Sequence, residues 1–293
     1  MATTNEQSTE PAHPIKLIVI DIDGTLLSPQ RTITPRTHAA IQAARRSGII
    51  VTLATGRRYI NVAPIADELG IDIPLILCDG SIIIEHPASN VLFTQPLDAS
   101  LAQQIVDVLV RHRIQPVVHH MNAGIEESWT GHEEFDTPSV RLYFKAWPEN
   151  THRRPHATLC IGQPNPLRVV AFASLEEIYK LSEEISKLNC SWNIVNTGNY
   201  GSSELAVMNP VCTKASGVQA LARHFGIAME QVMAIGDNNN DVEMLREVGW
   251  GVAMGQAEVH VKAAARAVTA SNAEDGTAQA IERYALNGSA RTA

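Results

Sequence analysis

The sequence has few cysteines, few aromatic residues (5%) and no long apolar run. Its four cysteines are widely spaced, at Cys78, Cys160, Cys190 and Cys212. They form neither a Cys-x-x-Cys pair nor a zinc-finger pattern, so we expect buried thiols in a reducing compartment. No apolar run approaches the roughly 18 residues of a membrane span, and the polar residues 1–7 are unlike a secretory signal. These absences predict a cytoplasmic protein with no membrane partner.

Basic residues are also in deficit. Lys and Arg number 23 against 31 Asp and Glu, which gives a formal net charge of −8. This balance argues against nucleic acid as the main partner, although one small electropositive pocket remains compatible with it. Hydrophobic residues make up 45% of the 293 residues, which excludes wholesale disorder. At about 150 residues per domain, the length predicts two domains or one large α/β unit.

The two ends of the chain alternate between strand and helix patterns. Residues 15–20 form an almost continuous apolar run, which is typical of a central parallel strand. Thr34 and Pro35 predict the start of a helix that ends at Gly48. Further strands are predicted over 49–54, 74–78, 232–235 and 251–254, and further helices over 59–69, 215–225, 241–248 and 278–284. This alternation predicts a doubly wound, Rossmann-like parallel sheet.

The middle of the chain is less regular. A hairpin is predicted over 81–94, helices over 101–109 and 176–188, and strands over 115–119, 167–173, 191–195 and 204–208. Residues 120–166 are predicted to be irregular. Because strands outnumber helices here, we expect an α+β domain inserted into the α/β core. The expected boundaries are 14–84 and 206–286 for the core and 85–205 for the insertion, with disordered ends at 1–13 and 287–293.

Polar residues gather where the predicted core strands end. Asp21-Ile22-Asp23-Gly24-Thr25 follows the first strand, Thr55-Gly56-Arg57 follows the second, and the acidic-amide run 236–241 follows the strand at 232–235. Lys214 lies near the start of a predicted helix. Because ligands of open α/β sheets bind at the carboxyl ends of the strands, we expect these side chains to meet at one rim.

The residue types at this rim suit phosphoryl transfer. Asp21 and Asp23, two residues apart at a strand end, are expected to point to the same side, where two ionised carboxylates repel unless a divalent cation binds them. Mg²⁺ prefers oxygen ligands and shares its remaining sites with phosphate, and Asp237 would add a carboxylate. A ligated Asp21 stays ionised and nucleophilic, whereas an unligated Asp23 side chain could act as an acid. Thr55 and Lys214 would bind the phosphoryl oxygens, so an aspartyl-phosphate route is available.

Four segments together resemble the motifs of the haloacid dehalogenase (HAD) superfamily of phosphohydrolases: 21–27, 53–57, Lys214 after Asn209-Pro210, and 236–241. More narrowly, the chain resembles the Cof-type phosphatases, which carry a type IIB α+β cap. The resemblance covers about residues 16–284, although in the cap it is topological. It implies a Mg²⁺-dependent phosphatase that hydrolyses a small phosphorylated metabolite, such as a sugar phosphate, through an aspartyl-phosphate. The cap would close over the core and recognise the leaving group.

The same resemblance assigns expected roles to the site residues. Asp21 would be the nucleophile and Asp23 the general acid/base, with the backbone carbonyl of Asp23 on the metal. Asp237 would bind the metal, and Asp241 would orient the metal-bound waters or the Lys214 side chain. The residues expected to bind the phosphoryl group are Thr55, Gly56, Lys214 and Asn240, with Asn240 contacting either that group or Lys214.

Asp79 departs from the family pattern. After the third strand such proteins commonly show Asn-Gly, whereas this chain has Asp79-Gly80. The glycine still allows a tight turn, but the extra carboxylate leaves the local hydrogen bonding open. We assign no catalytic role to Asp79 at this point.

Three alternatives remain compatible with the residues. A phosphomutase would use the same nucleophile but return the phosphoryl group to a sugar hydroxyl. A receiver-like switch also gathers Asp, Thr and Lys around Mg²⁺, although the twin Asp21 and Asp23 and the large insertion disfavour it. The third is a catalytically weak binding or regulatory protein on the same fold. The sequence carries no signal for an oligomeric state, and leaving-group recognition is expected within 120–166.

Overall fold

The computed structural model describes residues 10–122, 124–148, 150–163, 165–196, 198 and 200–287. The chain divides into two compact units, Met1–Phe93 with Thr213–Ala293, and Thr94–Cys212. Of the ends expected to be disordered, residues 1–9 and 288–293 lie outside the described residues. Residues 10–13 and 287 are described and belong to no helix or strand.

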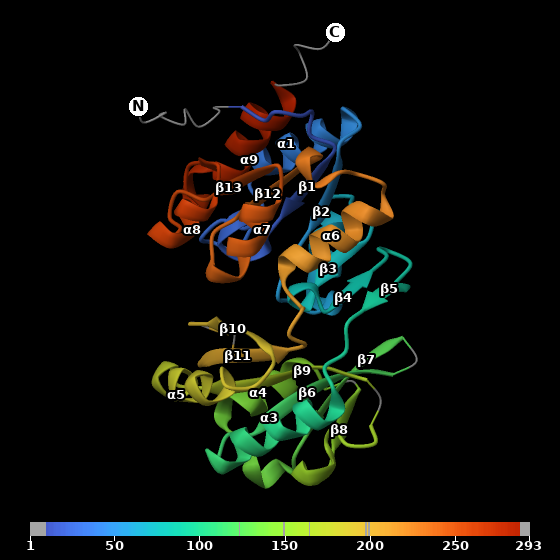
Figure 1. The fold of residues 1–293 in the computed structure, drawn as a ribbon, viewed down its shortest axis with the longest axis vertical. Coiled ribbons are helices and arrows are strands. Elements are labelled where there is room, and N and C mark those ends of the chain that lie inside the picture. Colours follow the sequence, from blue (N-terminus) through green and yellow to red (C-terminus); the bar gives the residue numbers. More distant parts are fainter. Residues whose placement is uncertain are drawn as a thin grey trace, which may run out of the picture. The chain divides into compact units, whose positions relative to one another are not determined.

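The first unit is built around a parallel sheet, as the alternating pattern predicts. Its strands are β1 (Leu17–Ile20), β2 (Ile50–Leu53), β12 (Val232–Gly236), β13 (Trp250–Ala253) and β14 (Ala267–Val268). They lie in the order β14-β13-β12-β1-β2, so that β1 is paired on both sides, with β12 and with β2 (Figure 1). Every residue of β1 is fully buried, which explains its continuous apolar sequence, since both faces of such a strand are covered.

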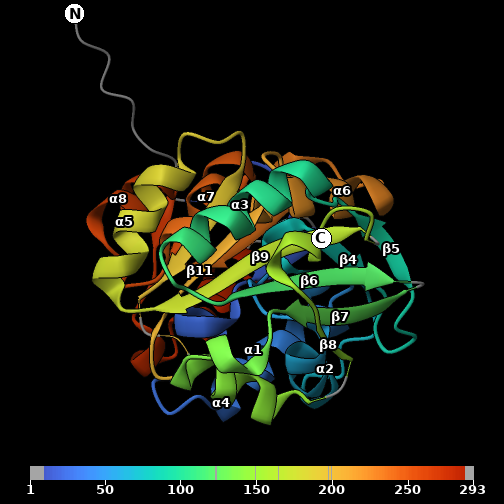
Figure 2. The ribbon, with the colours of Figure 1, turned by 90° about the horizontal axis from the view of Figure 1, so that it is seen from below.

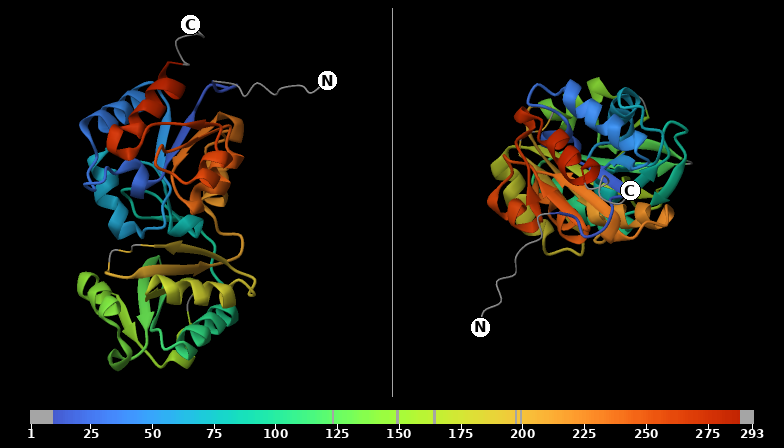
Figure 3. Two further views of the ribbon diagram at one scale, coloured as in Figure 1. Left: turned by 90° about the vertical axis from the view of Figure 1, so that its left-hand side faces the viewer. Right: turned by 90° about the horizontal axis from the view of Figure 1, so that it is seen from above.

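Helices cover both faces of this sheet. They are α1 (Pro35–Arg46), α2 (Tyr59–Glu68), α6 (Lys214–His224), α7 (Val242–Glu247), α8 (Val259–Ala264) and α9 (Gly276–Ile281). The left panel of Figure 3 shows the blue α1 and the red α9 on one side of the strands and the orange α6 and α7 on the other. Helix α1 begins where Thr34 and Pro35 predict, because the Thr34 side chain accepts a hydrogen bond from Thr37 N. The doubly wound α/β class is therefore confirmed.

The third predicted core strand does not join the parallel sheet as a full strand. Strand β3 (Leu75–Leu77) pairs antiparallel with β4 (Ile82–Ile84), in a small sheet that also holds β5 (Val91–Thr94). One parallel bridge, Ala54 to Ile76, connects β3 to the end of β2. The chain reverses at Cys78–Gly80, where three successive residues have positive φ, so β4 returns beside β3.

The second unit is a six-stranded sheet with helices on both faces. Its strands are β6 (Pro116–Asn122), β7 (Ile125–Thr130), β8 (Thr151–Arg153), β9 (Pro166–Ala173), β10 (Ser191–Val195) and β11 (Ser203–Met208), in the order β10-β11-β9-β6-β7-β8. Helices α3 (Ala99–Arg111) and α5 (Leu175–Ile185) pack on the face that carries Val118 and Val169; Figure 2 shows them over β11, β9 and β6. Helix α4 (Pro138–Ala146) packs on the opposite face, against Val117 and Val170.

Two sequence-based predictions for this unit were wrong. Residues 120–166 are not irregular, since they contain β7, α4 and β8. The start of α4 carries the same signal as α1, with Thr137 capping a helix whose first residue is Pro138. The expected boundary at 205/206 also falls inside β11, which pairs with β9 from Ser203 to Met208 and so belongs to the inserted unit.

The described helices share one further property. None of them is both long enough and apolar enough to cross a membrane.

Candidate active site

The predicted site residues of the first unit follow neighbouring parallel strands. Asp21 comes directly after β1, Thr55 two residues after β2, and Asp237 directly after β12. Ile20 at the end of β1 pairs in register with Leu53 of β2 and Ile235 of β12. Since parallel strands in register end at one edge, the three polar residues lie on the same rim of the sheet.

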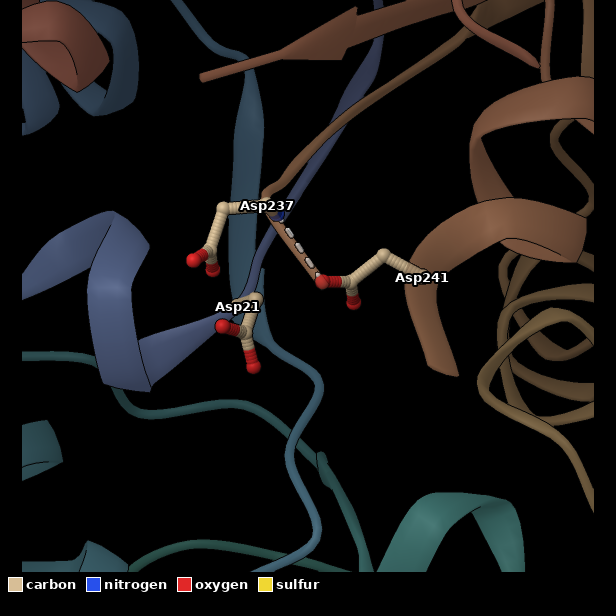
Figure 4. Close-up of side chains that lie close together, drawn as sticks. All are labelled: Asp21, Asp237 and Asp241. Carbon is tan, nitrogen blue, oxygen red and sulfur yellow. Dashed lines mark hydrogen bonds between the residues drawn. The ribbon is translucent and has the colours of Figure 1, made fainter. Parts of the chain in front are cut away.

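Three carboxylates meet at this rim. Asp21, Asp237 and Asp241 each offer a carboxylate oxygen, and these oxygens lie within 4.8 Å of one another; Figure 4 shows the three side chains together. Asp21 is 5% exposed and Asp241 is fully buried. Asp241 also stabilises the loop that precedes it, because its Oδ2 accepts hydrogen bonds from the backbone N–H groups of Asp237 and Asn238, both at 3.0 Å.

Lys214 provides the positive charge inside this group. It is the first residue of α6, after the capping residue Thr213, and it is 1% exposed. Its ammonium lies 2.6 Å from Asp21 Oδ1 and 2.7 Å from Asp241 Oδ1. Burial lowers the pKa of Lys214, but the charges of Asp21 and Asp241 raise it by more, so the net pKa is raised. The side chain therefore stays charged.

One ammonium does not balance the carboxylates. Burial raises the pKa of Asp21 well above its ordinary value, Lys214 opposes that shift, and Asp241 and Asp237 add to it. Burial and the Asp241 charge likewise raise the pKa of Asp237 to about 6. Grouped carboxylate oxygens with excess negative charge fit a hard divalent cation such as Mg²⁺. The donor set present therefore suits the metal that the family resemblance implies.

The loop after β1 passes directly over Asp237. Thr25 Oγ1 donates to Asp237 Oδ1 at 2.9 Å. A Cβ on Gly24 would lie 2.3 Å from Asp237 Oδ2, and Gly24 has φ +84°, so only glycine fits there. Gln256, which no sequence motif indicated, donates to Gly24 O at 2.6 Å and approaches Asp237 Oδ2 at 3.4 Å. These contacts fix the carboxylate of Asp237.

The side chain of Asp23 does not join the group that Asp21 forms. It is half exposed, and Arg57 holds it through two hydrogen bonds, Nε to Oδ2 at 2.7 Å and Nη2 to Oδ1 at 2.5 Å. The expectation that Asp21 and Asp23 share a side assumed strand alternation, but β1 ends at Ile20, before either residue. Arg57 belongs to the quoted motif, yet sequence reasoning gave it no role.

Three of the four expected phosphate-binding residues, Thr55, Gly56 and Asn240, lie next to Asp79. Thr55 is buried, and its Oγ1 accepts a hydrogen bond from Arg57 N at 3.2 Å. Asn240 Nδ2 donates to Asp79 Oδ1 at 2.8 Å. A Cβ on Gly56 would meet Asp79 Oδ2 at 2.9 Å. Asp79, which sequence reasoning left without a role, is 3% exposed. It is therefore a buried neighbour of Gly56 and Asn240.

The fold and this rim place the chain among α/β enzymes whose polar residues gather at the carboxyl ends of a parallel sheet. The model of the haloacid dehalogenase-like hydrolase family matches residues 18–281. The chain belongs to this family, and among its members it is a phosphatase.

Known relatives cover nearly the whole chain. It is 31% identical over 288 residues to the pyridoxal phosphate phosphatase YbhA of Escherichia coli, covering 92% of this chain and 99% of the relative. It is 31% identical to the 5-amino-6-(5-phospho-D-ribitylamino)uracil phosphatase YcsE of Bacillus subtilis, covering 93% and 96%. Among solved structures, the HAD subclass IIB sugar phosphatase BT4131 is similar at a TM-score of 0.73 and 26% identity, covering 91% of this chain and 98% of that one.

The raised pKa of Asp237 leads to a pH prediction for the metal-free protein. A carboxyl whose pKa is about 6 when folded and 3.8 when unfolded binds more protons in the folded state between these values. Its stabilising contribution is therefore complete below pH 3.8 and is lost as the pH rises through 6. In the wild type, this group should lower the free energy of unfolding by about 2–3 kcal/mol as the pH rises from about 4 to 7. We expect Asp237→Asn to remove that part of the pH dependence.

Urea denaturation of the metal-free protein across this pH range measures the effect. Asp72→Asn, which removes an exposed carboxylate of the same unit, is the matched control and should leave the profile unchanged. Profiles of Asp237→Asn and wild type that superimpose would show that Asp237 is ordinarily acidic in the folded protein.

Proposed function

We propose that this enzyme is a Mg²⁺-dependent phosphatase of small phosphorylated metabolites that works through an aspartyl-phosphate on Asp21. The observation that carries the proposal is the buried arrangement of Asp21, Lys214 and Asp241 beside Asp237. The names of the relatives support the substrate class, because they include phosphatases of pyridoxal phosphate, of a phosphoribitylaminouracil and of HMP-PP.

Asp21 is suited to attack phosphorus. Lys214 holds its Oδ1, and within the described part of the chain no hydrogen bond ends on Oδ2, so one oxygen is oriented and the other is available. In the proposed first step, an Asp21 oxygen bonds to phosphorus while the bond to the leaving-group oxygen breaks. In the second step, water attacks the same phosphorus and the Asp21 carboxylate is restored.

Asp23 would transfer the protons for both steps. As an acid it would protonate the departing oxygen, and as a base it would then take a proton from the attacking water. Its half-exposed position supports contact with a leaving group that arrives from solvent. The paired Arg57 would hold the Asp23 carboxyl group in place through its two hydrogen bonds.

We further propose that Asp21, Asp237 and the backbone carbonyl of Asp23 hold Mg²⁺, which supplies positive charge that draws Asp21 and the phosphate together. Asp241 suits a positioning role better than direct ligation, because Lys214 and two backbone N–H groups already occupy its oxygens. Thr55, Gly56, Lys214 and Asn240 would bind the phosphoryl oxygens.

The inserted unit, Thr94–Cys212, is proposed to recognise the leaving group as a cap. We also propose a cytoplasmic location, which the four free cysteines support because a reducing compartment preserves thiols.

Metal removal gives a direct test of the proposed activity. Phosphate release from a panel of phosphorylated metabolites should fall to background after chelation and return on addition of Mg²⁺, with Asp237→Asn needing a higher Mg²⁺ concentration, by about 10-fold or more. Full activity in chelator would contradict the proposal. An isomer of a hexose phosphate without free phosphate would instead identify a phosphomutase, and a stable phospho-aspartate without turnover a receiver-like switch.

A further inference from the structure

Asp79 is a buried acidic residue at this rim that the proposed mechanism leaves unused. It is 3% exposed, and it stands where Asn is common in the family that the sequence resembles. The backbone around Asp79 has an unusual conformation, because Cys78, Asp79 and Gly80 all have positive φ, at 50°, 52° and 88°. Such conformations cost free energy in residues with a side chain and gather at functional sites. Asp and Asn are the side chains that tolerate them best.

Three of the four residues proposed to bind phosphate contact Asp79. Its backbone N–H donates to Thr55 O at 3.0 Å. Its Oδ1 accepts from Asn240 Nδ2 at 2.8 Å. Its Oδ2 lies where a Cβ of Gly56 would approach to 2.9 Å, so the missing side chain of Gly56 makes room for the carboxylate. Asp79 therefore borders the proposed phosphate site.

The charge of Asp79 also acts on Lys214, the fourth residue proposed to bind phosphate. Burial lowers the pKa of Lys214, and Asp79 follows Asp21 and Asp241 among the charges that raise it. The following residue fixes the loop against the helix that carries this lysine, because a Cβ on Gly80 would lie 2.1 Å from Thr213 O. The negative charge of Asp79 thus acts on the ammonium proposed to bind phosphate.

We propose that Asp79 is a positioning residue that orients the Asn240 amide and, through its negative charge, weakens the binding of phosphate. The inference rests on the proposed function, since it concerns the product of that reaction. A carboxylate beside a bound dianion repels it strongly in a partly dry site, so inorganic phosphate leaves more readily than it would from the same site with Asn.

Two substitutions separate the two roles. Asp79→Asn keeps the shape, tolerates the positive φ and retains an oxygen that accepts from Asn240, while it removes the charge. Asp79→Gly also tolerates the backbone but removes both the charge and the acceptor. Ala is avoided because positive φ would strain it. Asp72→Asn is the control, since it removes an exposed charge that pairs with Arg45 and with no residue of the proposed phosphate site.

Titration calorimetry with inorganic phosphate in the presence of Mg²⁺ measures the affinity without turnover. We expect Asp79→Asn to lower the phosphate Kd on the order of tenfold, with KM for a phosphomonoester falling as well and kcat kept within about threefold. Asp79→Gly should also bind phosphate more tightly, but its kcat should fall about tenfold, because Asn240 loses its partner. Asp72→Asn should match the wild type.

The outcomes distinguish this inference from the proposed function. Hydrolysis by the wild type together with an unchanged phosphate Kd in Asp79→Asn overturns the inference alone. Equal kcat values in the Asn and Gly variants overturn the orienting role. A tighter phosphate Kd without any hydrolysis by the wild type supports the inference and overturns the proposed function. Absence of phosphate binding in every variant overturns both.

Discussion

Asp21→Asn should abolish phosphate release, by about a thousandfold or more, while the protein stays folded. The amide oxygen can still accept the hydrogen bond from Lys214, but a carboxamide is not a nucleophile toward phosphorus. Because burial and the neighbouring carboxylates raise the pKa of Asp21, removing its charge should not destabilise the core. Circular dichroism and thermal unfolding check the fold, and a phosphate-release assay with Mg²⁺ checks the activity.

Asp72→Asn is the matched control for this experiment as well. It makes the same chemical change at an exposed position of the same unit, where Asp72 pairs with Arg45, and should keep full activity. If Asp21→Asn hydrolyses phosphomonoesters at the wild-type rate, Asp21 is not the nucleophile.

Lys214→Met should cause the largest loss of stability of any substitution at the rim. It would leave Asp21 and Asp241 buried without the ammonium that lies 2.6 and 2.7 Å from them. Removing one partner of a buried ion pair typically costs 3–5 kcal/mol, because the remaining charge is uncompensated. Activity should disappear too, since Lys214 both orients Asp21 and is proposed to bind phosphate.

The origin of this loss can be checked in two ways. The loss should shrink from pH 7 to pH 5, because protonation of Asp21, whose pKa burial and the neighbouring carboxylates already raise, removes its uncompensated charge. The double variant Lys214→Met with Asp21→Asn should regain part of the stability, as a double-mutant cycle of urea midpoints would measure. Lys180→Met, at an exposed pair with Glu176, is the control and should cost less than about 1 kcal/mol. A similar small cost at Lys214 would show that the pair contributes little.

Local signals in the sequence predicted much of the core. The apolar run of β1, the Thr34-Pro35 start of α1 and the polar residues after each strand are local features, and each is in the structure where the pattern indicates. The inserted unit was predicted less well. Its segment 120–166 contains many turn-forming residues, which hid the short strands β7 and β8. The Thr137-Pro138 start of α4 is a local signal that was overlooked, whereas the packing of α4 on β6 and β9 is not encoded locally.

Sequence reasoning missed several residues of the rim for one reason, which is that their contacts join distant parts of the chain. Arg57 and Asp23 belong to different loops, Gln256 and Gly24 lie far apart in the sequence, and Asp79 meets its partner Asn240 across more than 160 positions of the chain. Spacing in the sequence carries no information about such contacts. The family pattern marked Asp79 as unusual, but only the folded loop shows that its carboxylate is buried against Gly56.

The composition predicted a folded protein with two domains or one large α/β unit. Four motifs identified its family, because the order of strands and of chemical groups is written along the chain. The tertiary structure decided which charges are paired. It buries Lys214 between Asp21 and Asp241 and turns Asp23 outward to Arg57. It also holds Asp79 beside the residues proposed to bind phosphate. These ion pairs and the position of Asp79 depend on burial and on the distances between loops. Both arise only when the parallel strands bring their carboxyl ends together.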